Sequence, residues 1–411
     1  MNEQQWQMIN QVENELQDRF KQISHTVTKN QAKVLRAFQS EQIGDIHFNP
    51  TTGYGYDDLG REKLELLYAS VFQTEDALVR PQIVSGTHAI STALFGLLRP
   101  GDELLSITGE PYDTLQSVIG ADQPIDGSLT DFGVHYQEVP LTDNGQIDYE
   151  AVRDKINPRT KVVTIQRSKG YADRPSFMVD DIKQMIDFVK SINPQVYVFV
   201  DNCYGEFVET QEPTEVGADL IAGSLIKNPG AGIVRTGGYI AGRADLIEKC
   251  ANRLTAPGLG KETGASLNSL QEMYQGLFLA PHIVGEALKG SYFTATLLCQ
   301  LGFETSPSPQ AERTDLIQSI TFSTKDEMVQ FAQVIQQQSP INAYVSPQPS
   351  AMPGYDHDVI MAAGTFIQGA SLELTADGPI REPYTLYVQG GLTYEHVKIA
   401  VMTALDQLGL V

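Results

Sequence analysis

The turn Ser85-Gly86-Thr87 is the first place where the residue types could do chemistry, because it follows a short apolar run and opens a helical pattern. A glycine turn at a helix N-terminus presents free backbone N–H groups, and the helix dipole favours an anion there. We therefore expect this turn to hold a phosphate group. Many small-residue turns before helices bind nothing, so a plain structural turn is the alternative.

Asp201 is the second candidate, because it ends the apolar run VYVFVD at 196–201. In open α/β sheets, ligands bind outside the carboxyl ends of the strands, where a carboxylate could hold a protonated ring nitrogen. An aspartate that caps the following helix is the alternative. In the same segment we expect Cys203 to be a packed thiol, and Glu206 to lie behind the site or at the surface.

Lys227 is the third candidate, because it lies among apolar and glycine residues in the run GSLIKNPGAG at 223–232. Burial lowers the pKa of a lysine and makes its amine a nucleophile that can form a Schiff base. A lysine that extends from a loop to water is the alternative. The order favours chemistry, since Lys227 follows Asp201 by 227 − 201 = 26 residues and Ser224 precedes it by three.

Short apolar runs alternate with helical patterns in the part of the chain that must position these residues. Amphipathic stretches between the runs, such as 179–192, predict helices. This alternation predicts an α/β fold with a mostly parallel sheet and helices on both faces. The expected strands are 82–84, 103–107, 134–139, 161–165, 196–201, 219–224 and 237–242.

The two ends of the chain differ from this pattern. Near the start, apolar residues recur every three or four positions, as in an amphipathic helix: Trp6, Ile9, Val12, Leu16 and Phe20. Near the end, apolar runs at 315–323, 371–375 and 384–389 with two helical patterns predict a smaller α+β domain. We therefore predict a helical arm at 1–50, a large domain at 51–290 and a small C-terminal domain at 291–411.

The charge balance limits the class of partner. The 411 residues include 29 Lys and Arg against 51 Asp and Glu, which gives a net charge of −22. So acidic a chain disfavours nucleic acid and anionic membranes as partners. The hydrophobic share of 41% suits a globular protein with a sizeable core. Any anionic ligand must be held by local devices such as helix N-termini and single arginines.

Cysteine and histidine usage limits the compartment and the metal chemistry. Cys203, Cys250 and Cys299 are far apart and predict no disulfide framework, which favours a reducing cytoplasm. The polar, acidic start does not resemble a signal peptide, and no apolar run approaches the roughly 20 residues that span a bilayer. The 7 histidines lack metal-ligand spacing. We expect a cytoplasmic protein without a metal site.

The order of phosphate turn, strand-end aspartate and Ser-x-x-Lys resembles that of fold-type-I pyridoxal 5'-phosphate (PLP) enzymes, and more narrowly cystathionine lyases and methionine γ-lyase. From about Gly53 to the C-terminus, the chain is similar to the methionine γ-lyase-related aluminium resistance protein family. The segments that carry this similarity are SGTHA, GEPYDTL, QRSKGY, DNCYGEF, GSLIKNPGAGIVRTGGYIAGR and REPYTLYVQGG. The resemblance implies an aspartate aminotransferase-like fold, with a large PLP-binding domain and a smaller α+β domain.

The resemblance assigns most of the cofactor contacts. It implies that the turn Ser85-Gly86-Thr87 binds the phosphate through backbone amides, and that the Ser224 hydroxyl binds it too. Tyr112, in GEPYDT, would stack on the pyridine ring, and Asp201 would keep the ring nitrogen protonated. Lys227 would carry PLP as a covalent aldimine and later move protons. His88 is expected to be a helix residue near the site rather than the stacking ring.

This chain departs from the related lyases at two sites, which bind the cofactor phosphate and the substrate carboxylate. The related lyases complete the phosphate site with a Tyr-x-Arg pair from a neighbouring subunit, whereas this chain offers Tyr54 or Tyr56, with Arg61 as the arginine. They also hold the substrate carboxylate with an arginine where this chain has Tyr387. The candidate replacements are Arg381, whose alternative is a surface ion pair with Glu382 or Asp377, and Arg174, which follows the run 161–165.

The leading expectation for function is a carbon–sulfur lyase that acts on a small sulfur-containing amino acid, by an elimination like that of cystathionine beta-lyase or methionine gamma-lyase. Transamination and cleavage of a β-hydroxy amino acid are alternatives, because one scaffold hosts many chemistries. A PLP-binding metal-stress protein without catalysis is the third possibility. We expect a homodimer or homotetramer with active sites shared between subunits.

Overall fold

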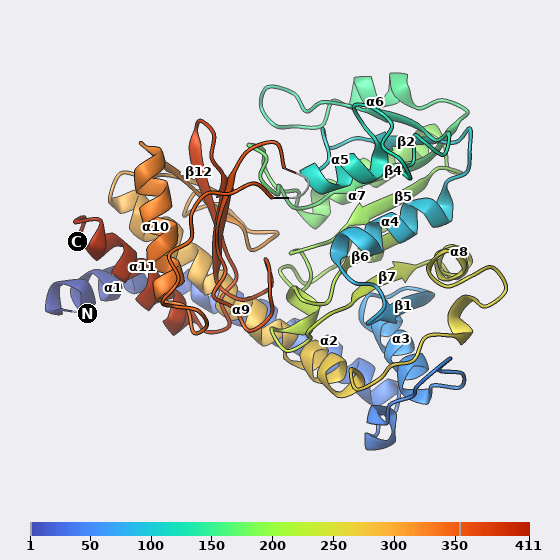
Figure 1. Cartoon of the computed structure of the whole chain (residues 1–411), viewed down its shortest axis with the longest axis horizontal. Coiled ribbons are helices and arrows are strands. Elements are labelled where there is room, and N and C mark those ends of the chain that lie inside the picture. The colour runs from blue at the N-terminus through green and yellow to red at the C-terminus, as the bar shows by residue number, and fades with distance from the viewer. Residues whose placement is uncertain (1, 353–354) are drawn as a thin grey trace.

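A computed structural model describes residues 2–352 and 355–411 and contains two sheets, the larger of which has seven strands (Figure 1). Its strand order is β1-β7-β6-β5-β4-β2-β3. β6, β5, β4, β2 and β3 run parallel, whereas β7 is antiparallel to both of its neighbours. The strands are β1 (Asp76–Arg80), β2 (Glu103–Ser106), β3 (His135–Glu138), β4 (Thr160–Gln166), β5 (Tyr197–Asp201), β6 (Leu220–Ser224) and β7 (Gly238–Gly242).

Both faces of the large sheet are buried, because successive side chains of a strand point to opposite faces. In β5, Val198 and Val200 pack into one core cluster while Phe199 packs into the other. In β6, Ile221 packs into the same cluster as Val198 and Val200, and Leu220 packs into the cluster of Phe199. A sheet covered on both faces is the architecture expected for parallel strands, and it confirms the α/β prediction.

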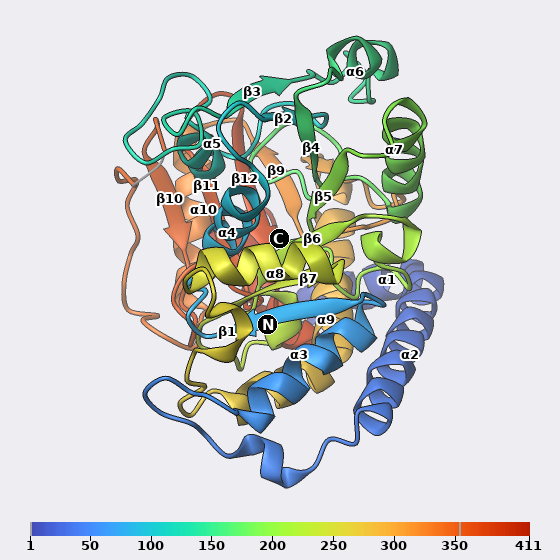
Figure 2. The same cartoon turned by 90° about the vertical axis from the view of Figure 1, so that its right-hand side faces the viewer.

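Helices cover the two faces of this sheet and connect its strands (Figure 2). α4 and α8 pack together on one face, while α3 and α7 contribute to the core of the other. The helix predicted at 179–192 is α7, with those bounds. The helices of this part are α3 (Leu59–Val71), α4 (Gly86–Leu97), α5 (Asp113–Ile119), α6 (Tyr149–Lys155), α7 (Val179–Ile192) and α8 (Ala244–Leu254).

Six of the expected strands lie where they were predicted, but the one at 82–84 is wrong. The strand is β1, five residues earlier in sequence, and it pairs antiparallel with β7 at the edge of the sheet. Its run DALVR has a charged residue at each end, so only the three residues between them are apolar. Arg80 is nonetheless buried there, because its Nε donates a 2.6 Å hydrogen bond to the equally buried Glu65.

The second sheet is antiparallel, with strand order β10-β11-β12-β9-β8, and it lies beside the carboxyl ends of the large sheet's central strands (Figure 1). The strand expected at 371–375 is wrong, because β11 begins only at Thr375. Glu373 instead folds back and accepts hydrogen bonds from the backbone N–H groups of Phe366 and Ile367. The elements are β8 (Glu304–Ser306), β9 (Gln318–Phe322), α10 (Lys325–Gln337), β10 (Val359–Ala362), β11 (Thr375–Pro379), β12 (Tyr384–Gln389) and α11 (Tyr394–Gln407).

Long helices join the two parts. α9 (Leu270–Gln300) packs along α2 (Gln17–Ser40) and reaches α11 and β9. It is continuous through residue 290, so the domain boundary predicted there falls inside one helix and stays a prediction. The N-terminal amphipathic pattern forms two helices, α1 (Glu3–Glu15) and α2, which meet at Leu16. Gln5 of α1 donates a hydrogen bond to Asp406 of α11, so the two ends of the chain lie together.

Candidate active site

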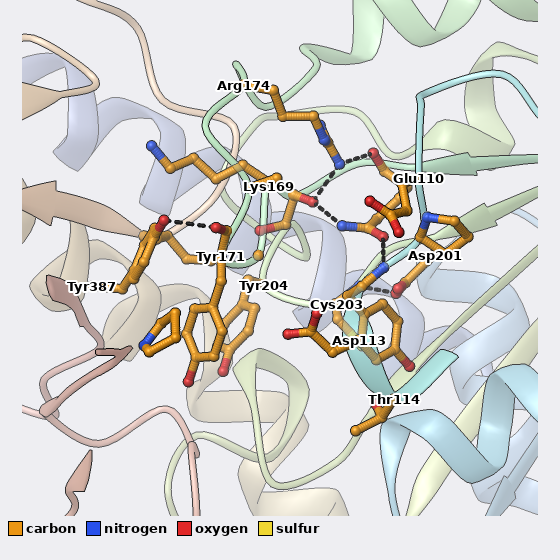
Figure 3. Close-up of a pocket in the computed structure, with 18 of the residues that line it drawn as sticks. Glu110, Asp113, Thr114, Lys169, Tyr171, Arg174, Asp201, Cys203, Tyr204 and Tyr387 are labelled. Carbon is orange, nitrogen blue, oxygen red and sulfur yellow. Dashed lines mark hydrogen bonds between the residues drawn. The ribbon is translucent and has the colours of Figure 1, made fainter. Parts of the chain in front are cut away.

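A cavity of about 890 Å³ opens at the carboxyl ends of β4, β5 and β6, between the two sheets (Figure 3). Parallel strands deliver their last residues to one edge, so segments distant in sequence meet there. The large sheet and its loops form one wall, and β11 and β12 form the other. All the residues predicted for PLP from one subunit line it, together with both candidate arginines: Ser85, Gly86, Thr87, Tyr112, Arg174, Asp201, Ser224, Lys227 and Arg381.

The N-terminus of α4 forms a small cradle at one end of the cavity. The Ser85 side chain caps the helix by accepting the His88 N–H at 3.0 Å, and the Ser85 carbonyl accepts the Ala89 N–H. The N–H groups of Gly86 and Thr87 lie ahead of these bonds, as free helix-terminal donors. A Cβ on Gly86 would lie 3.2 Å from Cys203 Sγ and 3.3 Å from Ser224 Cβ. Only glycine leaves this cradle open for an anion.

Asp201 lies in the floor of the cavity at the end of β5, with 6% of its surface exposed. Its Oδ1 accepts the backbone N–H of Cys203 at 3.1 Å. Burial raises the pKa of Asp201, while the Cys203 hydrogen bond and Lys227 oppose that rise. Burial also raises the pKa of Cys203, so it is a packed thiol rather than a nucleophile, as expected.

Lys227 follows β6 and extends into the cavity with its Nζ 3.9 Å from the centre of the Tyr204 ring. The expectation that burial lowers the pKa of Lys227 was wrong. Burial opposes a charge on this amine, but Tyr204, Cys203 and Asp201 outweigh burial and raise the pKa of Lys227 above its ordinary value. The alternative of a lysine that extends to bulk water does not fit this position. The amine is held where a carbonyl carbon in the cavity could reach it.

Tyr112 precedes α5 and lines the same cavity. Its hydroxyl lies 3.1 Å from Thr87 Oγ1, and its backbone N–H donates to Gln166 Oε1 at 3.0 Å. The phenol is therefore fixed beside the phosphate cradle. His88 turns the other way, because its Nδ1 accepts the Val84 N–H at 3.1 Å. These positions agree with the choice of Tyr112 over His88 as the ring that faces a ligand.

The side chains that line this cavity match the phosphate, the ring nitrogen and the aldehyde of PLP. The α4 cradle and Ser224 suit a phosphate, and the buried carboxylate of Asp201 suits a protonated ring nitrogen. Lys227 supplies the primary amine that an aldehyde requires. These groups belong to α4, β5 and β6, whose packing fixes them relative to one another.

The two candidate arginines have different surroundings. Arg174 donates to the carbonyl oxygens of Gln166 at 3.1 Å and Ser168 at 2.8 Å, and burial lowers its pKa to about 10. Arg381 is exposed and lines the cavity, where its charge opposes the rise that burial causes in the pKa of Glu110 and of Asp113. Within residues 2–352 and 355–411, Arg381 makes no ion pair, so the alternative of a salt bridge with Glu382 or Asp377 is not realised.

Sequence reasoning missed a second wall of the cavity, formed around Tyr171 and Asp377. The Tyr171 hydroxyl donates to the Asp377 carboxylate. The Tyr387 hydroxyl donates to the Tyr171 carbonyl at 2.8 Å (Figure 3). Asp377 and Tyr387 are cross-strand partners on β11 and β12. The motif QRSKGY contained Tyr171, but Asp377 lay beside a wrongly placed strand, so only the structure brings the two together.

Tyr54 and Tyr56 lie outside the cavity. They are 74% and 52% exposed, and their rings stack with centroids 5.4 Å apart. Arg61 is buried and already occupied, because its Nη1 donates to the carbonyl oxygens of Gly55 at 2.5 Å and Gly264 at 2.9 Å. Arg61 therefore holds loops together and is not free for a phosphate, while the two tyrosines are free to contact another molecule.

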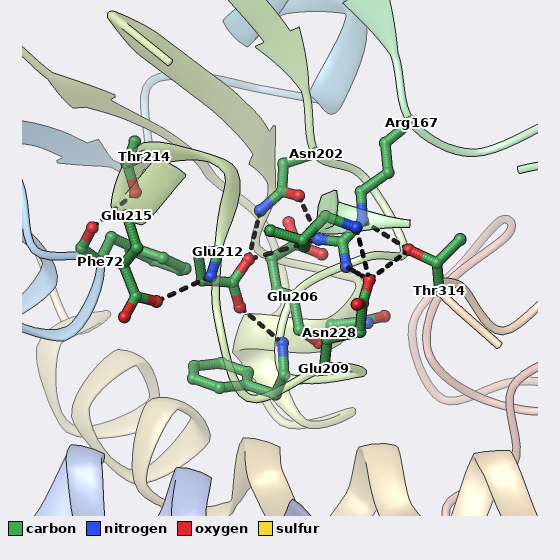
Figure 4. Close-up of polar contacts among 12 residues, drawn as sticks. Phe72, Arg167, Asn202, Glu206, Glu209, Glu212, Thr214, Glu215, Asn228 and Thr314 are labelled. Atoms are coloured by element: carbon green, nitrogen blue, oxygen red, sulfur yellow. Dashed lines mark hydrogen bonds and ion pairs between the residues drawn. The ribbon is translucent and has the colours of Figure 1, made fainter. Parts of the chain in front are cut away.

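A buried polar network supports the site from behind (Figure 4). Arg167 is fully buried and donates to Asn202 Oδ1 at 2.7 Å, next to Asp201 in the chain. It also pairs with Glu209 at 3.0 Å and Glu212 at 3.4 Å, and its Nε donates to the Thr314 hydroxyl at 3.0 Å. Asn202 in turn donates to Glu212 at 3.0 Å. The carboxyl end of β5 is thus anchored by charged side chains on the face opposite the cavity.

Glu206 belongs to the same network and is fully buried, so of the two expected positions it takes the one behind the site and not the one at the surface. It accepts the Tyr239 hydroxyl at 2.7 Å, and its backbone carbonyl accepts the side-chain amide of Asn228 at 2.9 Å. Burial raises the pKa of Glu206 to about 8. Because Asn228 follows Lys227, this contact fixes the backbone on the far side of the reactive amine.

Comparisons with known proteins agree with the geometry. The family described as methionine gamma-lyase matches residues 5–409. A crystal structure from Listeria monocytogenes, named as a candidate cystathionine beta-lyase involved in aluminum resistance, is 62% identical, with a TM-score of 0.96 over 98% of this chain and 99% of its own. A structure from Clostridium novyi, named as a carbon-sulfur lyase involved in aluminum resistance, is 49% identical, with a TM-score of 0.95 over 99% and 96%.

A sequence relative and a distant structure extend this comparison. The uncharacterized protein YnbB of Bacillus subtilis is 61% identical over 399 residues, which cover 97% of this chain and 95% of that protein. The PLP-dependent protein YhfS of Escherichia coli is only 17% identical but has a TM-score of 0.62, and this likeness shows the fold alone. In the described part of the chain, none of the helices has the length and apolar character needed to cross a membrane.

Proposed function

The chain belongs to the methionine gamma-lyase family, and on that premise we propose that it eliminates a thiol from a small sulfur-containing amino acid by breaking a carbon–sulfur bond. The family and its structural relatives make the chain a PLP-dependent lyase. Cystathionine beta-lyase and methionine gamma-lyase activities are the two forms of this reaction that the relatives' names suggest. The substrate must be found by experiment.

PLP, when bound, supplies an electron sink for the negative charge that develops at the substrate's α-carbon. Gly86, Thr87 and Ser224 would hold its phosphate, and Asp201 would hold a proton on its ring nitrogen. The rise in the pKa of Asp201 on burial is opposed by the Cys203 N–H and by Lys227, which favours the carboxylate form. Tyr112 would support the ring from the side of α5.

Lys227 is the residue assigned to anchor the cofactor and to move a proton at the α-carbon. Its Nζ lies against the Tyr204 ring inside the cavity. Asn228 and Glu206 fix the backbone beside it. Proton transfer needs a group held within hydrogen-bond reach of the atom that it serves, and such anchoring meets this need.

Arg381 is the proposed partner of the substrate carboxylate. A planar guanidinium can meet a carboxylate with two parallel hydrogen bonds. Arg381 lines the cavity without an ion pair among the described residues, whereas Arg174 already donates to Gln166, Ser168 and Pro175. The freedom of Arg381 to reorient supports this choice.

We propose a homodimer, or a tetramer built from such dimers, in which Tyr54 and Tyr56 reach the phosphate end of a neighbour's cavity. Both rings are exposed and face away from their own cavity. A closed, symmetric pair would bury them. Light scattering on the PLP-bound protein tests this assembly, and a monomer that still binds PLP tightly would refute it.

The meeting of Lys227, Asp201, Ser224 and Gly86 in one cavity carries the proposed function, because each supplies one requirement of PLP. Purified enzyme should release ammonia and pyruvate or 2-oxobutyrate, together with a thiol from cystathionine or methionine or hydrogen sulfide from cysteine. Mass spectrometry of the products identifies the bond that breaks. Turnover of a β-hydroxy amino acid to an aldehyde and an amino acid, without thiol release from any sulfur substrate, would replace this proposal.

A further inference from the structure

Asp377 places a second buried carboxylate in the cavity wall, apart from Asp201. It lies on β11 with 1% of its surface exposed. Tyr171 donates its hydroxyl to Oδ2, and Gln389 donates its side-chain amide to Oδ1 at 3.3 Å. These two neutral donors leave lone pairs free, because an ionised carboxylate can accept about four hydrogen bonds.

This carboxylate makes no ion pair among the described residues, although the charge of Lys227 acts on it and lowers its pKa. Among the described residues, no Lys or Arg lies within ion-pair distance of Asp377, although buried charges in proteins are normally paired. Burial accordingly raises its pKa to about 6. Lys169 also lines the cavity, but its Nζ turns away and donates to Ser306 and Ser319 (Figure 3). Lys227 is the amine proposed to hold the cofactor.

Aromatic rings surround the same wall. The Tyr171 ring lies 5.0 Å from that of Tyr387 and 5.8 Å from that of Tyr355, and all three line the cavity. The face of a tyrosine ring attracts a cation, and aromatic cages recognise ammonium groups in this way. The Lys227 ammonium, 3.9 Å from the Tyr204 ring centre, already occupies such a position inside the cavity.

The charge of the whole cavity lining also favours a positively charged ligand. Eight acidic residues face four basic ones: Glu110, Asp113, Glu138, Asp173, Asp201, Asp356, Asp377 and Glu382 against Lys169, Arg174, Lys227 and Arg381. A cleft lined mainly by one sign of charge concentrates ligands of the other sign. The cofactor's phosphate would add further negative charge.

We propose that Asp377, with Tyr171, Tyr355 and Tyr387, forms a subsite for a positively charged amine at the far end of the substrate's side chain. The ligand class is an amino acid with a distal ammonium group, such as a thioether that carries a second amino group. The assignment rests on the proposed function only in that the substrate's α-amino end meets the cofactor near Lys227. A cavity of about 890 Å³ accommodates a ligand of this length.

The test compares two amino acids that lack a sulfur leaving group. Lysine carries the distal ammonium, and norleucine has the same carbon chain without it. Calorimetric titration of the PLP-bound enzyme should show lysine binding at least about tenfold more tightly, the gain expected of a charge-assisted hydrogen bond. Asp377→Asn should remove this preference while norleucine affinity stays unchanged. Glu382→Gln, which removes an exposed acid from the same lining, should keep it.

The pH dependence of the wild-type enzyme tests the subsite without relying on the folding of a variant. The ratio of lysine to norleucine affinity should fall as pH drops from about 8 to about 5, because protonation removes the Asp377 charge. The tyrosines that face Asp377 keep one protonation state over this range, because their pKa values are raised above their ordinary basic values: Tyr171, Tyr204, Tyr355 and Tyr387. Lys227 also faces Asp377, but it is the proposed anchor of the cofactor, and its effect is common to the lysine and norleucine complexes.

The outcomes separate this subsite from the lyase proposal. Equal affinity for lysine and norleucine in the wild type, or a preference that survives in Asp377→Asn, overturns the subsite even if the enzyme cleaves carbon–sulfur bonds. A lysine preference that depends on Asp377 supports the subsite even if no sulfur substrate is turned over, because neither test ligand can undergo thiol elimination.

Discussion

Arg167 Nη1 donates a 2.7 Å hydrogen bond to Oδ1 of Asn202, the residue that follows Asp201. The guanidinium is fully buried, and a Cβ on Gly205 would lie 2.5 Å from the same Nη1. A charged network therefore packs directly under the strand end that carries Asp201 (Figure 4). Its removal should affect the stability of the fold as well as the site.

Arg167→Met should lower the free energy of unfolding by about 3–5 kcal/mol, because it leaves the carboxylate of Glu212 buried and unpaired. Chemical denaturation measures the change. Lys183→Met is the control, since Lys183 pairs with Asp187 at the exposed surface of α7 and its loss should matter by less than about 1 kcal/mol. Equal effects of the two substitutions would show that the buried network adds nothing to stability.

Glu206 should make the folded state less stable as pH rises. Its pKa is 4.5 when unfolded and about 8 in the buried site, so the folded state binds the proton more tightly between these values. The free energy of unfolding should fall by up to about 1.4 kcal/mol per pH unit in that window. Glu206→Gln should flatten this slope in urea denaturation series, and Glu304→Gln, at an exposed position, should not. A parallel slope in Glu206→Gln would show that Glu206 does not titrate there.

Gly86→Ala should weaken PLP binding by about tenfold or more, because the added Cβ fills the cradle between Cys203 and Ser224 and blocks the anion from the helix N-terminus. Equilibrium dialysis with PLP measures the affinity. Gly44→Ala is the control, because a Cβ at Gly44 meets nothing within 4 Å. Unchanged affinity in Gly86→Ala would place the phosphate elsewhere.

Arg381→Lys should weaken the binding of any amino acid by about tenfold, because an ammonium cannot form the two parallel hydrogen bonds of a guanidinium. The visible absorbance of the bound cofactor should stay unchanged before the ligand is added. Titration with a slow amino-acid ligand measures the affinity. Arg174→Lys is the matched comparison, and a loss confined to that variant would transfer the role to Arg174.

Much of the large sheet could be predicted because its strands β4 to β7 are mainly apolar runs. β1 was misplaced because the charge of Arg80 is neutralised by Glu65, a contact between elements that no local pattern reveals. The helix at 1–40 was read as one, although it divides at Leu16. The apolar pattern of the sequence thus located the strands whose residues are buried along their whole length.

The phosphate turn, Asp201 and Lys227 could be found because each sits at a strand end or helix start, where local sequence determines position. The wall of Tyr171 and Asp377 could not, because it joins the loop after β4 to β11, 206 residues apart in the chain. The choice between the two positions expected for Glu206 stayed open for a similar reason, since its buried contacts are with Tyr239 and Asn228. Contacts between distant elements need the tertiary structure.

The account depends most directly on which lysine carries the cofactor. Two lysines line the cavity, Lys227 beside Asp201 and Lys169 beside Ser306 and Ser319. Reduction of the PLP-bound enzyme with sodium borohydride, followed by proteolysis and mass spectrometry, fixes and locates the adduct. We expect a pyridoxyl group on Lys227, and none in Lys227→Ala. A pyridoxyl group on Lys169, or an adduct that persists in Lys227→Ala, would contradict the account.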